Sequence, residues 1–212
     1  VALRARRRRA PASRVTAVRA RHALVAAVGL AAAGAAAAQT VEPVRGFEPE
    51  RYLGTWHQIA AIPAWFQDQC AFDVTATYNR DDEPDRLRVL NACRTADGTL
   101  DQVVGRARFT ESPDVGALEV TFVEFLGAWR WFAGGDYVVI ALGDDYGWSA
   151  VAHPSRDFAW ILARERELDP ATLAEIERAY LDAGYDTCRL LRTPLEPGGA
   201  ETPLCEWTAE AP

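Results

Sequence analysis

The stretch RYLGTWHQIAAIP, residues 51–63, opens the first strand-like run of a 212-residue chain. Gly54 and Thr55 lead into Trp56, and the run continues with residues that are mostly apolar. A large indole at the start of a strand buries much apolar area and offers a π-face to neighbouring side chains. What this tryptophan does depends on the fold that the rest of the sequence predicts.

Short runs with a period of two extend from residue 52 to residue 164, and turn residues separate them. Apolar side chains alternate with polar ones, which is typical of antiparallel strands with one buried face. An acidic turn at residues 81–84 joins two of these runs into a hairpin. In the runs between residues 72 and 122, the expected inward-facing residues include Phe72, Val74, Ala76, Tyr78, Val89, Val103, Ala107, Phe109, Leu118, Val120 and Phe122.

Three further runs, residues 136–142, 148–153 and 158–164, are more apolar on both sides. Such a pattern indicates that another element covers their outer face. We assign Tyr137, Val139 and Trp160 to the inner face, together with the residues of the earlier runs.

A helix over residues 169–183 is the predicted cover. Asp169 is suited to its N-terminal cap and Gly184 to its C-terminal end. A short ninth strand, residues 188–192, follows and precedes a tail rich in proline and glycine. The apolar face of the helix is expected to contain Leu173, Ile176, Tyr180 and Leu181.

Eight consecutive strands can remove their edges by closing into a barrel. We therefore expect an all-β fold, an eight-stranded antiparallel up-and-down β-barrel with one C-terminal flanking α-helix and a short ninth strand. Eight strands enclose just enough volume for one small ligand. The inward set mixes large and small residues, which favours a partly open interior. A fully packed core is the alternative that alternation leaves open.

The first 38 residues differ from the rest. Eight arginines precede an apolar run at residues 23–35, and small residues follow, an order typical of a secretory signal. The apolar run is shorter than the roughly 20 residues that a bilayer span needs, which argues against a transmembrane anchor. No cysteine near Ala38 offers a lipid acceptor, so we expect export to the periplasm or cell envelope. The expected divisions are a signal peptide 1–38, a linker 39–46, a barrel 47–192 and a tail 193–212.

Charge bounds the partners of the processed chain. All 30 acidic residues lie beyond residue 38, whereas 8 of the 23 basic residues precede it, so the remainder has a formal charge of −15. Such a surface repels phosphate backbones, and we expect no nucleic acid partner.

The cysteine count is even, with Cys70, Cys93, Cys188 and Cys205. In an exported chain this predicts two disulfides. A zinc site is the competing interpretation, but no C-x-x-C pair is present and the three histidines are scattered, so we expect no metal. If the strands around the turn at 81–84 pair, Cys70 and Cys93 lie nearly opposite on one face, which favours the local pairing with Cys188 to Cys205.

Three sequence blocks resemble those of the lipocalin family, especially its bacterial outer-membrane members and apolipoprotein D. They are Gly54-Thr55-Trp56, Asp144-Asp145-Tyr146 in a turn, and the run FAWILAR at residues 158–164. The resemblance covers roughly residues 47–192. Apolipoprotein D is wired differently, and by this resemblance Cys70 to Cys205 with Cys93 to Cys188 stays open as an alternative.

The resemblance implies a closed end and an open end of the barrel. At the closed end, Arg164 is expected to lie across Trp56, a cation-π contact of about 0.5 to 2 kcal/mol. Gly54, Asp145 and Tyr146 are expected to belong to the same structural end. Trp56 would then seal the barrel without contacting the ligand.

The open end is expected to carry the ligand chemistry. Loops that should surround the mouth contain large apolar residues, which usually mark a binding rim or a membrane contact. Their folding inward over a packed barrel is the alternative. The expected rim residues are Trp65, Phe66, Trp129, Trp131 and Phe132.

We expect the chain to bind and to store or transport a small hydrophobic or amphipathic ligand, of the fatty acid or lysophospholipid class by resemblance, without a cofactor. Cys70 is the one candidate nucleophile near the mouth, and a disulfide would remove it, so we expect no enzyme. A lipid- or isoprenoid-modifying enzyme and a packed envelope protein with an aromatic docking rim are the alternatives. The sequence leaves open peripheral membrane contact and the choice between monomer and homodimer.

Overall fold

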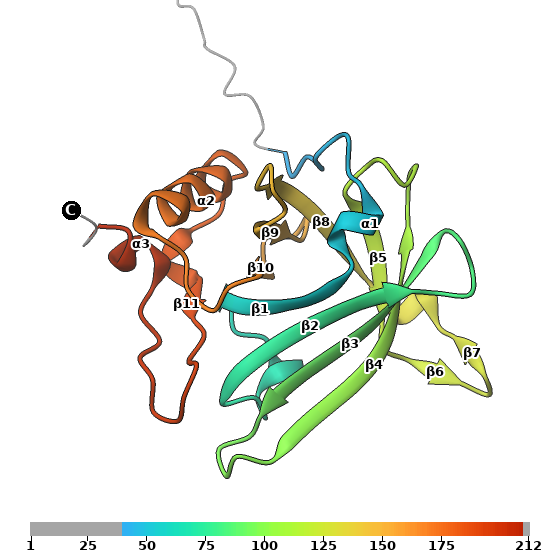
Figure 1. Ribbon diagram of the computed structural model, residues 1–212, viewed down its shortest axis with the longest axis horizontal. Helices are drawn as coiled ribbons and strands as arrows, with labels where there is room; N and C mark the ends of the chain where they lie inside the picture. Colours follow the sequence, from blue (N-terminus) through green and yellow to red (C-terminus); the bar gives the residue numbers. More distant parts are fainter. Residues whose placement is uncertain (1–39, 210–212) are drawn as a thin grey trace, which may run out of the picture. The chain divides into compact units, whose positions relative to one another are not determined.

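The computed structural model describes residues 40–209. Eight of its strands follow one another around an antiparallel sheet in chain order (Figure 1). The sheet closes because the last strand pairs with the first, with Ala163 opposite His57 and Trp160 opposite Ala61. The expected barrel is thereby confirmed. Its strands are β1 Gly54–Ala61, β2 Phe72–Arg80, β3 Arg86–Arg94, β4 Leu100–Phe109, β5 Ala117–Thr121, β8 Gly135–Leu142, β9 Trp148–Ala152 and β10 Ala159–Ala163.

Shorter elements connect and flank the barrel strands. A two-stranded hairpin, β6 with β7, stands apart from the main sheet. Within the described part of the chain, no helix combines the length and apolar character that a bilayer span requires. The remaining elements are α1 Pro49–Tyr52, η1 Trp65–Gln67, β6 Glu124–Phe125, β7 Ala128–Trp129, η2 Trp131–Ala133, α2 Pro170–Asp182, η3 Thr187–Arg189, β11 Leu191–Arg192 and α3 Leu204–Trp207.

Helix α2 covers the outside of β9 and β10, on the other side of the barrel from the β6–β7 hairpin (Figure 1). The Asp169 carboxylate accepts hydrogen bonds from the Ala171 and Thr172 amides and so caps the helix. Leu173, Ile176 and Tyr180 are buried against the sheet. Leu181, which we expected on the same face, is 49% exposed, because it lies 100° around the helix from Tyr180.

The ninth strand is shorter than expected. Residues 187–189 form a 3-10 turn, in which the Asp186 carboxylate accepts a hydrogen bond of 3.1 Å from the Cys188 amide. This side-chain bond competes with strand geometry. Only Leu191–Arg192 pairs with the end of β1.

The segments expected as a linker, residues 39–46, and as a tail, residues 193–212, both pack against the barrel domain in part. The Val44 amide donates to the Val139 carbonyl at 2.8 Å, so part of the expected linker packs on β8. In the tail, Leu204 is fully buried. Disulfides join Cys70 to Cys93 and Cys188 to Cys205, with Cα separations of 5.5 and 5.0 Å, which is the local pairing that the strand register favoured.

A bulge at the start of β2 changes which side chains face inward. Asp73 has φ of 51°, and the register with β3 shifts between Phe72 and Thr75. An extra residue in one strand breaks the alternation between the two faces. Phe72 is therefore out of phase with Val74, contrary to the expected pattern.

The closed end is built around Trp56, which is completely buried. Its indole nitrogen donates to the Tyr52 carbonyl at 2.8 Å. The Arg164 guanidinium lies 3.7 Å from the ring centroid. It also donates to three backbone carbonyls, those of Arg51, Leu53 and Thr55, at 2.8 to 2.9 Å. Burial lowers the pKa of Arg164 from its ordinary value.

Gly54 is required by this contact. Its φ of 96° is a conformation that residues with a side chain rarely adopt, and a Cβ there would lie 3.3 Å from Arg164 Nη1. The turn at Asp145 and Tyr146 lies at the same end. The Tyr146 hydroxyl accepts a hydrogen bond of 2.8 Å from the Glu48 amide, and the Asp145 carboxylate accepts one of 2.8 Å from the Gly147 amide.

Replacing Arg164 tests how much the closed end contributes. Arg164→Met leaves three carbonyls without their charged donor and removes the cation-π contact, so we expect the free energy of unfolding to fall by about 2–4 kcal/mol. Arg166→Met is the matched control. Its ion pair with Asp73 is half exposed, so that loss should stay below about 1 kcal/mol. Urea unfolding followed by circular dichroism measures both, and equal losses would contradict the assigned role.

Candidate ligand chamber

The interior of the barrel contains a chamber of about 400 Å³. The loops β1–β2, β5–β8 and β9–β10 contribute to its lining, so it opens at the end opposite Trp56. Most of its lining is apolar. Of the expected lining and rim residues, the structure brings together Trp65, Phe66, Val74, Ala76, Tyr78, Val89, Val120, Phe122, Tyr137 and Trp160.

Four expected lining residues lie instead in the closed-end core. The segment before β1 inserts Phe47 and Tyr52 into that end, and these rings pack among the inward side chains. Phe47 lies 6.2 Å from Phe109 between ring centroids. The space below the chamber is therefore filled, and the side chains that it absorbs are Ala107, Phe109, Leu118 and Val139.

Val103 faces the same side as Asn91 but is 45% exposed and does not line the chamber. The reason is the short β5, which pairs with β4 only from Arg106 to Phe109. Residues 100–105 of β4 therefore lack a neighbouring strand on that side.

The hairpin between β5 and β8 carries the remaining expected rim residues away from the mouth. The outer face of β3 and β4 presents arginines, and the tryptophans stack on them. Arg108 lies 4.4 Å from the Trp131 ring and Arg106 lies 5.6 Å from the Trp129 ring. Phe132 is 90% exposed. None of these three aromatic residues lines the chamber.

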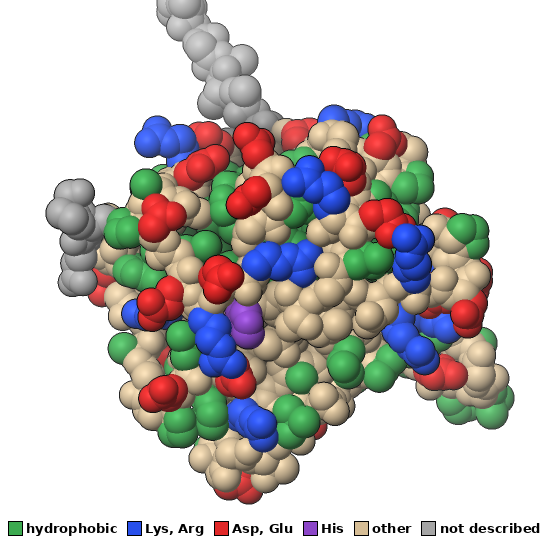
Figure 2. Space-filling view, viewed as in Figure 1, with side chains coloured by type: hydrophobic (Ala, Val, Ile, Leu, Met, Phe, Trp, Pro, Cys, Tyr) green, Lys and Arg blue, Asp and Glu red, His purple; other side chains and the backbone are tan. Residues whose placement is uncertain are grey.

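The tip of this hairpin is also apolar. Phe125 and Leu126 are exposed there, and Figure 2 shows hydrophobic side chains gathered at the end of β6–β7. Elsewhere on the same face, acidic, basic and smaller hydrophobic groups are intermixed (Figure 2).

The floor of the chamber is a chain of hydroxyl groups. Tyr78 and Tyr137 line the chamber, and their hydroxyl oxygens are 2.8 Å apart. Tyr137 bonds onward to Tyr52 at 2.7 Å, and Tyr52 to Ser149 at 3.0 Å. Burial raises the pKa of Tyr52 to about 12 and raises the pKa values of Tyr78 and Tyr137 well above 10.

Sequence reasoning missed Tyr52 and Ser149 as parts of this floor. Tyr52 precedes the first strand, where alternation says nothing about direction. Ser149 lies in β9, whose five residues are all buried, so its strand gives no contrast between inner and outer face.

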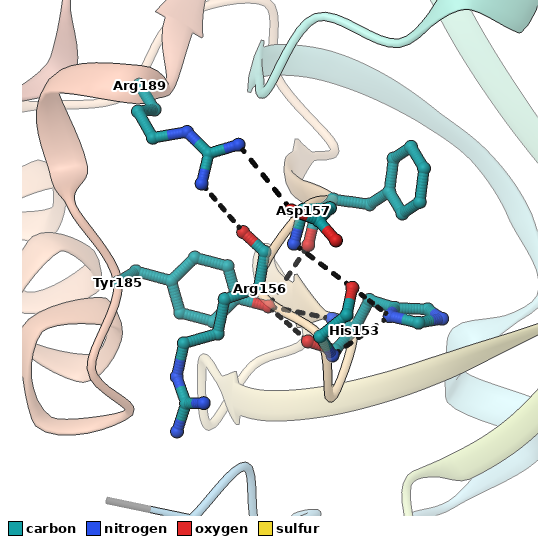
Figure 3. Close-up of polar contacts among 7 residues, drawn as sticks. His153, Arg156, Asp157, Tyr185 and Arg189 are labelled. Carbon is teal, nitrogen blue, oxygen red and sulfur yellow. Dashed lines mark hydrogen bonds and ion pairs between the residues drawn. The ribbon is translucent and has the colours of Figure 1, made fainter.

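One side of the mouth is fixed by the turn between β9 and β10 (Figure 3). His153 Nδ1 lies 2.9 Å from Ser155 Oγ within the turn. Tyr185 follows α2 in the chain, and its hydroxyl accepts a hydrogen bond of 2.8 Å from the His153 amide. The same hydroxyl oxygen lies 3.0 Å from the Phe158 carbonyl oxygen. Arg189 donates to the Arg156 carbonyl at 3.2 Å. The helical side of the molecule therefore positions His153 and Phe158, which line the chamber.

Aromatic and amide groups complete the mouth. Phe158 and Trp160 are nearly parallel, with an interplanar angle of 7°, and Phe66 packs against both. The Trp160 indole donates to Gln67 Oε1 at 3.3 Å, and Gln67 donates to Gln58 at 3.2 Å.

Charged groups are scarce in the chamber. Of its lining residues, Asp136 is an acid and none is an arginine. Cys70, the candidate nucleophile near the mouth, is bonded to Cys93. Across residues 40–209, no group of three His, Cys, Asp or Glu side chains is arranged to hold a metal ion.

The barrel has eight strands, a tryptophan under an arginine at one end and a chamber at the other. Comparison of the sequence with models of known protein families agrees with this architecture. The model of the lipocalin-like domain matches residues 47–195. The chain belongs to the lipocalin family. Lipocalins bind small hydrophobic ligands within the barrel.

Known proteins similar to this lipocalin include examples from a bacterium, a monkey and an insect. Outer membrane lipoprotein Blc of Escherichia coli K12 is 36% identical over 152 residues, which cover 71% of this chain and 81% of that protein. Apolipoprotein D of Macaca fascicularis is 32% identical over 161 residues, covering 74% and 82%. The structure of insecticyanin from the tobacco hornworm Manduca sexta has a TM-score of 0.58 at 19% identity, covering 76% and 88%.

The floor of this lipocalin predicts a limit to stability at high pH. Because the floor tyrosines have folded-state pKa values above the unfolded value of about 10, the unfolded chain releases these protons first. The free energy of unfolding should be unaffected by them below pH 10 and should fall as the pH rises further. Phenolate absorbance near 295 nm and circular dichroism are followed together. Floor phenolates that form while the barrel stays folded would contradict the prediction.

Proposed function

We propose that this lipocalin binds a small hydrophobic or amphipathic molecule, of the fatty acid or lysophospholipid class, and stores or transports it. The observation that carries the proposal is the apolar chamber of about 400 Å³ inside the barrel. Its volume falls within the roughly 300–1,000 Å³ of small-molecule sites. It corresponds to about a dozen waters at ~30 Å³ each, and a methylene group is of similar size.

The driving force is desolvation. Burying a methylene group contributes about 0.8 kcal/mol, so about a dozen of them supply close to 10 kcal/mol before the losses from ordering. Phe66, Phe158 and Trp160 at the mouth extend the apolar path to the outside. A longer chain would leave its polar end among the mouth residues.

A binding role is favoured over an enzymatic one. The reactive cysteine that a catalytic mechanism would use is tied up, since Cys70 forms a disulfide with Cys93. The deeper ionisable groups of the chamber are tyrosines whose pKa values burial raises, so they act as hydrogen-bond donors near neutral pH.

Export fits the same proposal. Two disulfides are typical of an oxidising compartment. We propose that residues 1–38 direct the chain to the periplasm or cell envelope as a signal peptide, although they lie outside the described residues. Residues 47–192 then form the barrel domain.

The exposed large apolar side chains suit a peripheral membrane contact. Trp65 at the mouth is 78% exposed and Leu126 at the hairpin tip is 86% exposed. Apolar side chains of this size on a surface usually mark an interaction site. Contact of this kind would bring the mouth close to a source of lipid.

A substitution at Gly135 tests the chamber. Gly135 lines it and lies opposite Val120, so a side chain there points inward, and a Cβ meets no atom within 4 Å. Gly135→Phe should therefore fold normally and bind at least about tenfold more weakly, since it fills space that the ligand needs. Displacement of 11-(dansylamino)undecanoic acid by palmitate and by palmitoyl lysophosphatidylcholine measures the affinity.

The control is Gln102→Phe, which adds the same ring to an exposed position of β4. It should leave the affinity within about twofold of the unmodified protein. The proposal fails if delipidated protein binds neither the probe nor the competitors, or if Gly135→Phe and the control bind alike.

A further inference from the structure

The hydroxyl chain at the chamber floor has one proton more than it can use. Ser149, Tyr52, Tyr137 and Tyr78 are joined in that order by three hydrogen bonds. Each hydroxyl has one proton to donate. Three bonds therefore use three of the four protons, and one hydroxyl in every arrangement has no acceptor within the chain.

The position of that proton depends on the direction of the bonds. All of them point toward the hydroxyl that keeps its proton free, so the chain has four arrangements. In two of these, the free proton belongs to Tyr78 or Tyr137, the members that line the chamber. A buried donor without an acceptor costs about 1–3 kcal/mol, so an oxygen atom placed above the floor favours these arrangements.

Asn91 supplies a second polar group above the floor. It lies two residues along β3 from Val89, on the same face, opposite Ala76. Its side chain lines the chamber, and its Oδ1 atom is buried without a hydrogen-bond partner. The amide thus offers polar contact one inward position nearer the mouth.

The charge of the ligand group decides whether its oxygen atom can bind at the floor. No arginine lines the chamber, and the acid that does, Asp136, is exposed. A carboxylate or phosphate at the floor would lose its hydration without gaining a counter-ion, which costs several kcal/mol. An uncharged hydroxyl or carbonyl oxygen loses far less and gains the floor donor.

We propose that the chamber floor recognises an uncharged oxygen atom of the ligand, which enters first, while the hydrocarbon fills the space up to the aromatic mouth. The inference rests on the proposed function. Within the amphipathic class it selects molecules with a hydroxyl or carbonyl group at the buried end, such as long-chain alcohols and ketones. Charged groups stay at the mouth.

Two probes of equal length test the selection. 1-Decanol and decanoate differ in their oxygen group and charge, and titration calorimetry at pH 8 measures both on delipidated protein. We expect 1-decanol to bind at least about tenfold more tightly than decanoate, because only the alcohol reaches the floor without a buried charge. This ratio is measured on the unmodified protein and needs no variant.

A variant then assigns the ratio to the floor. Tyr78→Phe/Tyr137→Phe removes both hydroxyls that line the chamber and keeps the rings. It should weaken 1-decanol binding about tenfold and change decanoate binding less than about twofold. Tyr146→Phe removes a hydroxyl at the closed end, outside the chamber lining, and should change neither affinity. Thermal unfolding verifies that each variant is folded, and if the double variant is not, the ratio measured on the unmodified protein decides alone.

Equal affinities for the two probes, or a ratio that the floor variant leaves unchanged, would overturn the inference and leave the proposed function standing. Binding of neither these probes nor the dansylated fatty acid would overturn both.

Discussion

The contact of Arg164 with Trp56 holds the last strand of the barrel to the first. The guanidinium covers the indole and at the same time bonds three carbonyls of residues 51–55, so one side chain from the end of β10 fixes the start of β1. The indole in turn donates to the Tyr52 carbonyl. Since the Tyr52 hydroxyl belongs to the chamber floor, the seal and the floor share one residue.

The mouth is supported from a different part of the chain. The β9–β10 turn is bonded to Tyr185 and Arg189, which follow helix α2. Helix α2 itself packs on β9 and β10 through Leu173, Ile176 and Tyr180. The chamber thus has two independent supports, the N-terminal segment below and the helical segment beside its opening.

Sequence patterning predicted the barrel because alternation survives wherever two strands pair without interruption. It predicted Ala76, Tyr78 and Val89 as lining for that reason. It failed at Phe72, where a bulge shifts the register, and at Trp131, whose ring lies over Arg86 of β3 and Arg108 of β4, a contact that no periodicity reveals. How much of the interior stays open depends on side chains from the segment before β1, whose direction no periodicity reveals.

Because Tyr52 belongs to both the seal and the floor, the positions in this protein differ in how freely they can be substituted. A substitution of Tyr52 removes both the ring that packs 4.7 Å from the Trp56 ring and the hydroxyl of the floor, so it alters the seal of the barrel and the chemistry of its deepest point together. Side chains of the mouth loops, such as Trp65, belong to neither the seal nor the floor. Substitutions in the mouth loops can therefore change ligand preference without weakening the closed end, whereas a substitution of Tyr52 at the chamber floor disturbs both.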